Sequence, residues 1–227
     1  GVAWRQNIVP LRVLDATKEG STANVIAAFN YATLMRSRGA ANIRVLNASW
    51  GGNVFSESLR ETIKLAGDTG ILTVAAAGNG DILGRGVDLE SQPFYPASFD
   101  LDSVISVTAA DTQDNLARFS NFGRRSVDLA APGIGIWSTE PGNSYQQRNG
   151  TSMATPHVTA SVALVWSHLP TATPIQVKQA ILASVDPLPQ LQNVVATGGR
   201  LNVERALLFD PVAPTATLGT VTNVELA

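Results

Sequence analysis

One serine in this sequence lies where a nucleophile could be held. Ser152 belongs to the run Asn-Gly-Thr-Ser-Met-Ala-Thr-Pro-His (149–157), between a glycine-containing turn and the predicted start of a long apolar helix. The free amides and the dipole at the start of a helix favour negative charge that develops beside them. The position therefore suits an attacking hydroxyl, while the alternative for a bare Gly-x-Ser pattern is a serine that only caps a buried helix.

Asn79 is a second candidate, in the run Val-Ala-Ala-Ala-Gly-Asn-Gly (74–80). It follows the apolar segment 71–77, which is predicted to be a buried strand because apolar residues do not alternate with polar ones. Ligands of α/β proteins bind beyond the carboxyl ends of such strands. The alternative is an ordinary turn residue, since Asn-Gly is a common turn pair.

The chain offers no evident base for Ser152. His157 is five residues further on, so on a helix it points about 140° away from the serine. His168 would lie roughly 24 Å further along the helix axis. A Ser-x-x-Lys dyad is also excluded, because Thr155 stands three residues after the serine.

Composition limits the classes of protein. Of the 227 residues 44% are apolar and 15% charged, with a net charge of −2 and no cysteine. This suits a globular domain without disulfides or thiolate zinc sites, and it gives no electrostatic footprint for nucleic acid. The longest apolar runs are shorter than the ~18 residues of a membrane span, so no membrane partner is expected.

Strands and helices are expected to alternate along the chain, as in a doubly wound α/β fold with a mostly parallel sheet and helices on both faces. Apolar or β-branched runs predict strands over 9–14, 43–48, 71–77, 104–109, 127–130 and 134–138. Capping residues predict helices that begin after Ser21 or Thr22, Ser56, Thr173 and Asn202. Residues 1–209 are expected to form one domain, and the Pro- and Thr-rich residues 210–227 a linker or the start of a further domain.

The nonapeptide 149–157 and the run Ala-Gly-Asn (77–79) resemble segments of subtilisin-like serine peptidases (subtilases, S8 family). Further matches are Phe-Ser-Asn-Phe-Gly (119–123) and Val-Asp-Leu-Ala-Ala-Pro-Gly (127–133), and the resemblance extends from Gly1 to about Leu207. It implies a serine endopeptidase that hydrolyses peptide bonds through an acyl-enzyme on Ser152. It also implies that the Asn79 amide donates to the oxyanion beside the backbone N–H of Ser152.

The resemblance further implies where an extended peptide or protein substrate binds. The peptide would pair as an added strand with an exposed backbone edge, and two walls would enclose a side-chain pocket with Ala97 at its base. The walls are formed by Ser49, Trp50, Gly51 and Gly52 on one side and by Ala76, Ala77 and Gly78 on the other. Trp50 is bulkier than the aliphatic residue expected at its position.

The family's catalytic aspartate and histidine are expected upstream of Gly1. The chain would then lack the N-terminal strand and helix of the fold, and its partner would be its own N-terminal segment carrying Asp and His. Alone it is expected to be inactive and to fold poorly, because removing a strand opens a buried sheet edge. The alternative is a catalytically dead subtilisin-like fold that binds peptides.

Other expectations come from the family or exclude other families. The chemistry needs no cofactor and no metal ligand is assigned, but structural calcium and secretion are expected by analogy, although no signal peptide is visible. A dinucleotide-binding G-x-G-x-x-G motif is unmet, because Leu83 stands three residues after Gly80. An α/β-hydrolase elbow would need glycine in place of Ala154.

Overall fold

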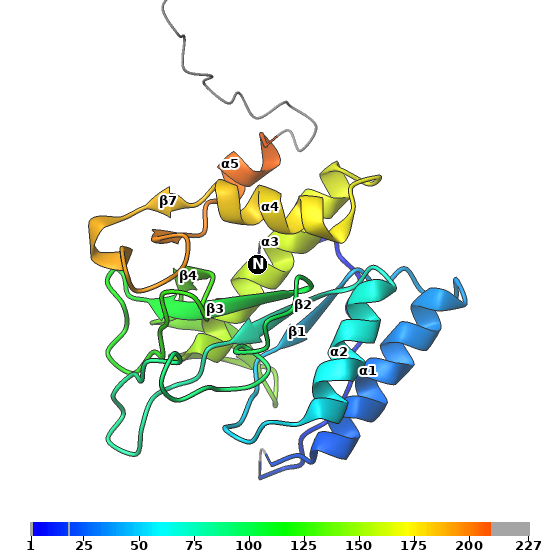
Figure 1. Ribbon diagram of the computed structural model, residues 1–227, viewed down its shortest axis with the longest axis horizontal. Coiled ribbons are helices and arrows are strands. Elements are labelled where there is room, and N and C mark those ends of the chain that lie inside the picture. Colours follow the sequence, from blue (N-terminus) through cyan, green and yellow to red (C-terminus); the bar gives the residue numbers. More distant parts are fainter. Residues whose placement is uncertain (1, 18, 210–227) are drawn as a thin grey trace, which may run out of the picture.

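A six-stranded, mostly parallel sheet forms the centre of the protein (Figure 1). The computed structural model describes residues 2–17 and 19–209, and the predicted linker 210–227 lies outside them. Neighbouring strands are parallel except for the last pair, which is antiparallel. In the order of the sheet the strands are β1 (Val45–Ala48), β2 (Leu72–Ala76), β3 (Val104–Ala110), β4 (Leu129–Pro132), β8 (Gly199–Arg200) and β7 (Asp186–Pro187).

Helices cover both faces of this sheet. On one face α1 (Thr22–Ser37) and α2 (Glu57–Asp68) pack side by side (Figure 1). On the other, α3 (Thr151–His168) crosses β1 to β4 and packs against α4 (Pro174–Ala183) and α5 (Val203–Leu207). None of the helices in residues 2–17 and 19–209 is long and apolar enough to cross a membrane.

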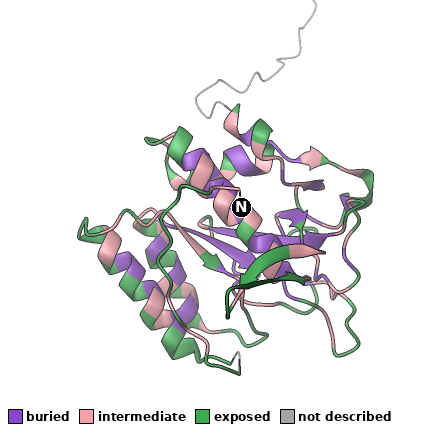
Figure 2. Ribbon diagram, turned by 180° about the vertical axis from the view of Figure 1, so that it is seen from behind, coloured by how far each residue is buried: buried purple, intermediate pink, exposed green. Residues whose placement is uncertain are grey.

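Side chains that alternate along β2 explain why both faces are covered. Leu72 and Val74 belong to the core cluster beneath α3 and α4, whereas Ala75 belongs to the cluster beneath α1 and α2. Every residue of β2 and β3 is buried, and Figure 2 shows these strands enclosed between helices with exposed outer faces. Strands buried on both sides are near-continuous apolar runs, and in β2 and β3 only Thr73, Ser106 and Thr108 are polar. The predicted doubly wound α/β fold is confirmed.

The predicted helix starts are also confirmed, because they depend on local chemistry. At each start a side-chain oxygen accepts a hydrogen bond from a backbone N–H of the first turn, which otherwise lacks a partner. The capping residues are Ser21, Ser56, Thr173 and Asn202.

The strand predicted over 9–14 is wrong. The first regular element of the described chain is α1, and β1 forms the edge of the sheet with no described strand beyond it. A strand exists only where a neighbour satisfies its backbone groups, and β-branched composition does not supply that neighbour.

A hairpin precedes α3. The strand predicted over 134–138 lies at β5 (Ile136–Glu140), where it pairs antiparallel with β6 (Ser144–Arg148). The sequence did not predict β6, because its Ser-Tyr-Gln-Gln-Arg run has no apolar alternation. An ion pair between Arg148 and Glu140 joins the two strands.

Candidate active site

Ser152 is the second residue of α3. The preceding Gly150 is the N-cap, with φ 152° and ψ 159°, a conformation essentially restricted to glycine. Its N–H donates to Gly133 O at 2.8 Å, and the N–H of Gly135 donates to Asn149 Oδ1 at 2.7 Å. Glycine geometry and two hydrogen bonds to the loop between β4 and β5 therefore fix the turn that precedes the serine.

Ser152 and Ser49 exchange two hydrogen bonds. Ser152 Oγ donates to Ser49 O at 3.0 Å, and Ser49 Oγ donates to Ser152 O at 2.9 Å. Ser152 O is free of the helical ladder, because its usual donor would be the N–H of residue 156, which is proline. The Ser49 hydroxyl thus replaces a missing helical bond and ties the backbone of Ser152 to the loop after β1.

Asn79 faces the same helical turn. Its Oδ1 accepts from Thr151 N at 2.8 Å and from Thr151 Oγ at 3.0 Å, and the N–H of Gly78 donates to that hydroxyl at 3.2 Å. A backbone N–H can only donate, so the carboxamide oxygen must face Thr151 and the NH₂ group must point away from it. Thr151 is fully buried and Asn79 is exposed. The buried Thr151 therefore orients the Asn79 side chain, whose other side is accessible to solvent.

Two N–H donors in this turn have no acceptor among the described residues. They are the backbone N–H of Ser152 and the side-chain amide Nδ2 of Asn79. The first amides of a helix have no partner within the helix. The first turn of α3 thus carries a hydroxyl and an unpaired backbone donor, and Asn79 is held beside this turn by its hydrogen bonds with Thr151.

Asn121 holds the loop that carries Asn79. It is buried, its Nδ2 donates to Ala77 O at 2.8 Å, and its Oδ1 accepts from Gly80 N at 2.9 Å and from Val87 N at 3.1 Å. These bonds fix the backbone on both sides of Asn79. A buried amide whose oxygen and nitrogen are both hydrogen-bonded rigidifies its surroundings.

The two predicted walls both begin at the turn of Ser152. The first wall contacts the serine through Ser49 and pairs further on through Gly52 with Tyr95, in an antiparallel bridge with N···O distances of 2.9 and 2.8 Å. That bridge leads into Ala97, which is buried. The second wall is buried as well and comprises Ala76, Ala77 and Gly78.

Trp50 does not lie free beside the serine. Its ring packs edge-on against Phe29 of α1, with 6.4 Å between ring centroids, and contacts the core cluster beneath α1 and α2. The extra bulk of this residue is therefore accommodated against the helical layer.

Neither histidine contacts Ser152. His157 Nδ1 lies 2.9 Å from Met153 O of its own helix, and His168 is the last residue of α3. The exclusion of both histidines by helical geometry is confirmed. Among the described residues, the partner of Ser152 Oγ is a carbonyl oxygen and not a base.

The carboxyl groups with strongly shifted pKa values serve the scaffold. Burial raises the pKa of Asp128, although the nearby Lys178 opposes this shift. Burial also favours protonated Glu90, but hydrogen bonds from Arg125 and Ser126 prevail and lower its pKa to about 2. Within the described residues no three His, Cys, Asp or Glu side chains gather as a metal site.

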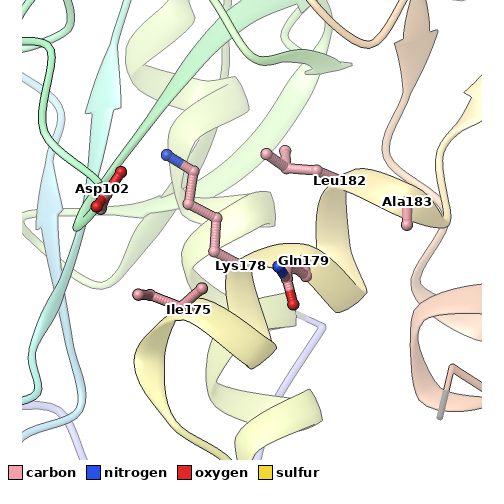
Figure 3. Close-up of a pocket in the computed structure, with 6 residues that line it drawn as sticks. All are labelled: Asp102, Ile175, Lys178, Gln179, Leu182 and Ala183. Carbon is pink, nitrogen blue, oxygen red and sulfur yellow. The ribbon is translucent and has the colours of Figure 1, made fainter. Parts of the chain in front are cut away.

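A cavity of about 460 Å³ lies at the opposite end of the sheet (Figure 3). Asp102 at its rim precedes β3, whereas Asn79 follows the neighbouring parallel strand β2, so the cavity and Ser152 are at opposite strand ends. In Figure 3 the ammonium group of Lys178 extends from α4 towards the start of β3, where it donates to Val104 O. The lining residues are Asp102, Ile175, Lys178, Gln179, Leu182 and Ala183.

Sequence reasoning gave no role to Thr151, Asn121 or Phe94. Thr151 orients the Asn79 amide and Asn121 holds its loop, while Phe94 lies between the two walls. Thr151 and Asn121 do stand inside the motifs quoted above, and Phe94 lies three residues before Ala97. Proximity in sequence was thus a usable signal, but only the contacts show what each side chain does.

Comparison with known proteins places the chain in a family. Residues 1–206 match the subtilase family, peptidase S8. Subtilisin DY of Bacillus licheniformis is 34% identical over 206 residues, which cover 91% of this chain and 70% of that protein. Subtilisin NAT of Bacillus subtilis subsp. natto is 37% identical over 181 residues, 80% of this chain and 44% of that protein.

A more distant organism contributes a third relative. Subtilisin-like protease 2 of Plasmodium falciparum is 36% identical over 171 residues, which cover 74% of this chain but 12% of that protein. The chain thus spans less than half the length of two of these three relatives. The match to the family over nearly the whole described chain, together with the mostly parallel sheet, shows that this protein belongs to the subtilase family of serine peptidases.

Proposed function

We propose that the protein is a serine endopeptidase that cleaves peptide bonds through an acyl-enzyme on Ser152. The observation that carries this proposal is the first turn of α3, where the Ser152 hydroxyl meets two unpaired donors, its own N–H and Asn79 Nδ2. Thr151 and Asn121 support the orientation of Asn79. Preorganised donors of this kind stabilise the transition state because they need no reorientation during the reaction.

The reaction proceeds in two halves. Ser152 Oγ attacks the carbonyl carbon of the scissile bond while its proton passes to a histidine, and the carbonyl oxygen takes negative charge opposite the two donors. Collapse of this intermediate expels the amine, which takes the proton from the histidine and leaves an ester on Ser152. Water then attacks the ester while the same histidine takes its proton, and the histidine passes that proton to Ser152 Oγ as the ester bond breaks and the carboxylic acid leaves.

The histidine and its orienting aspartate come, in this proposal, from the protein's own N-terminal segment. Both histidines of this chain lie away from Ser152, whose hydroxyl donates to Ser49 O. Ser49 follows the open edge strand β1, so a segment that pairs with this edge would arrive beside the serine. This chain alone would show at most weak residual rate enhancement, since a serine without its base is a poor nucleophile.

An extended peptide or protein is the proposed substrate. The backbone of Ser49 to Gly52 offers an edge for strand addition, with Ala76 to Gly78 opposite and Ala97 at the base. Secretion and structural calcium are proposed by analogy with the family, and the chemistry itself needs no cofactor.

A second candidate is a catalytically dead fold that binds peptides. The hydrogen bond from Ser152 Oγ to Ser49 O favours this second candidate, because the hydroxyl proton that a base would have to accept is already donated to a carbonyl oxygen. The two candidates share the peptide groove and differ in whether a histidine reaches Ser152.

Hydrolysis of a peptide anilide and labelling by a fluorophosphonate, each with and without the upstream segment, test this proposal. We expect both activities to appear on addition of the segment and to vanish in Ser152→Ala. Ser167→Ala, at the exposed far end of the same helix, is the matched control and should keep full activity. No gain on adding the segment would overturn the endopeptidase proposal, and peptide binding without labelling would favour the dead fold.

A further inference from the structure

Both walls contact the first turn of α3, which carries Ser152. The first wall reaches the serine through Ser49 O, 3.0 Å from Ser152 Oγ, and the second through Gly78 N, 3.2 Å from Thr151 Oγ. The substrate residue whose carbonyl is attacked must lie closest to Ser152 Oγ. Under the proposed function, its side chain lies in the space between the two walls.

The ring of Phe94 already occupies part of that space. A Cβ atom on Gly51 of the first wall would overlap Cε1 of this ring and would lie 2.8 Å from its Cζ. A Cβ atom on Gly78 of the second wall would lie 3.1 Å from Cδ1 and 3.2 Å from Cε1 of the same ring. One edge of a single aromatic ring thus touches both walls, and glycine at both positions leaves room for it.

The ring cannot easily move aside. The backbone of Phe94 is fixed, because its N–H donates to Ser98 Oγ at 3.0 Å and its carbonyl accepts from Ser98 N at 2.9 Å. The next residue, Tyr95, is paired with Gly52 of the first wall. The ring also packs against the core cluster that includes Ala77, so displacing it would open a cavity in that cluster.

We infer that Phe94 determines substrate specificity by shortening the pocket, so that the residue before the scissile bond has a small side chain such as that of glycine, alanine or serine. This inference rests on the proposed peptidase function. A packed ring rejects a large side chain because accommodating it forces strain, whereas a small side chain fits above the ring without displacing it.

The test compares peptide substrates that differ only at the residue before the scissile bond, using the protein together with its upstream segment. For the wild type we expect kcat/KM to be ~10- to 200-fold higher with alanine than with phenylalanine at that residue. In Phe94→Ala this ratio should fall by about tenfold or more and approach inversion, because the vacated volume accepts an aromatic ring. Phe94→Leu should give an intermediate ratio.

Phe55→Ala is the matched control. Phe55 contacts Tyr95, with ring centroids 5.4 Å apart, but none of its atoms is among the three nearest to a Cβ placed on Gly51 or Gly78. It should leave the ratio of alanine to phenylalanine cleavage unchanged. A general loosening of the Tyr95 region would instead shift the ratio in both variants and would overturn the inference.

The outcomes separate this inference from the function on which it rests. An active wild type that cleaves after phenylalanine as well as after alanine overturns the role of Phe94 and leaves the peptidase proposal intact, even if Phe94→Ala does not fold. Absence of hydrolysis and of fluorophosphonate labelling in the wild type contradicts the peptidase proposal, and the inference about Phe94 then fails as well.

Discussion

The two edges of the central sheet end in different ways. At one edge β8 pairs antiparallel with β7, and Arg200 makes ion pairs with Asp114 and Asp186 at 2.7 and 2.8 Å. At the other edge no described strand lies beyond β1. No catalytic residue is proposed at the closed edge, whereas the open edge leads directly into Ser49 and through it to Ser152.

This difference associates function with the open edge. An unpaired edge strand presents backbone groups that a further strand can satisfy, and proteins usually protect such edges. The extended N-terminal part of the chain likewise leaves large apolar side chains exposed at Trp4, Ile8 and Val9. We therefore expect the open edge to receive further polypeptide, in agreement with the proposal that the catalytic base arrives there.

The largest effect on activity is expected when the side chain of Asn79 is removed, since Asn79 follows β2, the strand next to the open edge. Asn79→Ala should lower kcat by about 10²- to 10³-fold with little change in KM, the loss known for such a donor in a subtilisin. Steady-state kinetics of the protein with its upstream segment measure both constants. Asn30→Ala on exposed α1 is the control, and a loss confined to KM would contradict a role in the transition state.

Hydrogen exchange should separate the two edges directly. With the upstream segment at about 100 times its Kd, binding contributes about 2.7 kcal/mol, so exchange from β1 should slow by about 100-fold. Exchange from β8 should change much less, since that edge is already paired. Equal protection of both edges would mean that the segment stabilises the whole fold without docking at β1.

The closed edge should matter for stability and not for activity. Arg200→Met removes ion pairs to two carboxylates and should lower the free energy of unfolding by about 1 kcal/mol, because these groups are partly exposed and screened. Denaturant unfolding measures this change. Arg60→Met is the control and should lower the free energy of unfolding less, because its partners Glu57 and Glu61 are exposed on α2. A loss of activity in Arg200→Met would contradict the assignment of function to the open edge alone.

A pH-dependent effect is expected at Glu90, whose carboxylate accepts hydrogen bonds from Arg125 and Ser126. Its pKa is lowered from 4.5 to about 2 in the fold, so its ionised form stabilises the protein above pH ~4.5 and this contribution is lost as the pH falls towards 2. Glu90→Gln should therefore lower the Tm at neutral pH and should match the wild type near pH 2. Glu57→Gln is the control, and a difference that persists at pH 2 would point to packing instead of charge.

Local chemistry explains which parts of the fold the sequence could predict. Ser21 and Ser56 were predictable as caps because their partners lie within the next turn. The segment 9–14 has the composition of a strand but no neighbour, and Ser144–Arg148 has a neighbour without the composition. Strand formation depends on pairing across the chain, which propensity alone does not contain.

The candidate site divides in the same way. Ser152 and Asn79 were identifiable as candidates because each stands in a long, specific motif beside an expected element boundary. Phe94 was not, because its role depends on Gly51 and Gly78, which come from two separate loops and meet only in the folded protein. Substrate specificity of the kind proposed for Phe94 depends on residues from separate loops, so it cannot be predicted from one continuous sequence motif.

Pro156 has a consequence for the order in which the protein assembles. By leaving Ser152 O without a helical donor, it makes that oxygen depend on Ser49, which is 103 residues away in sequence. Closing so long a loop is entropically costly and belongs to slow, non-local steps of folding. The Ser49 hydroxyl can reach Ser152 O only when the loop after β1 lies against α3, so we expect this hydrogen bond to form only after the sheet edge has packed against the helix.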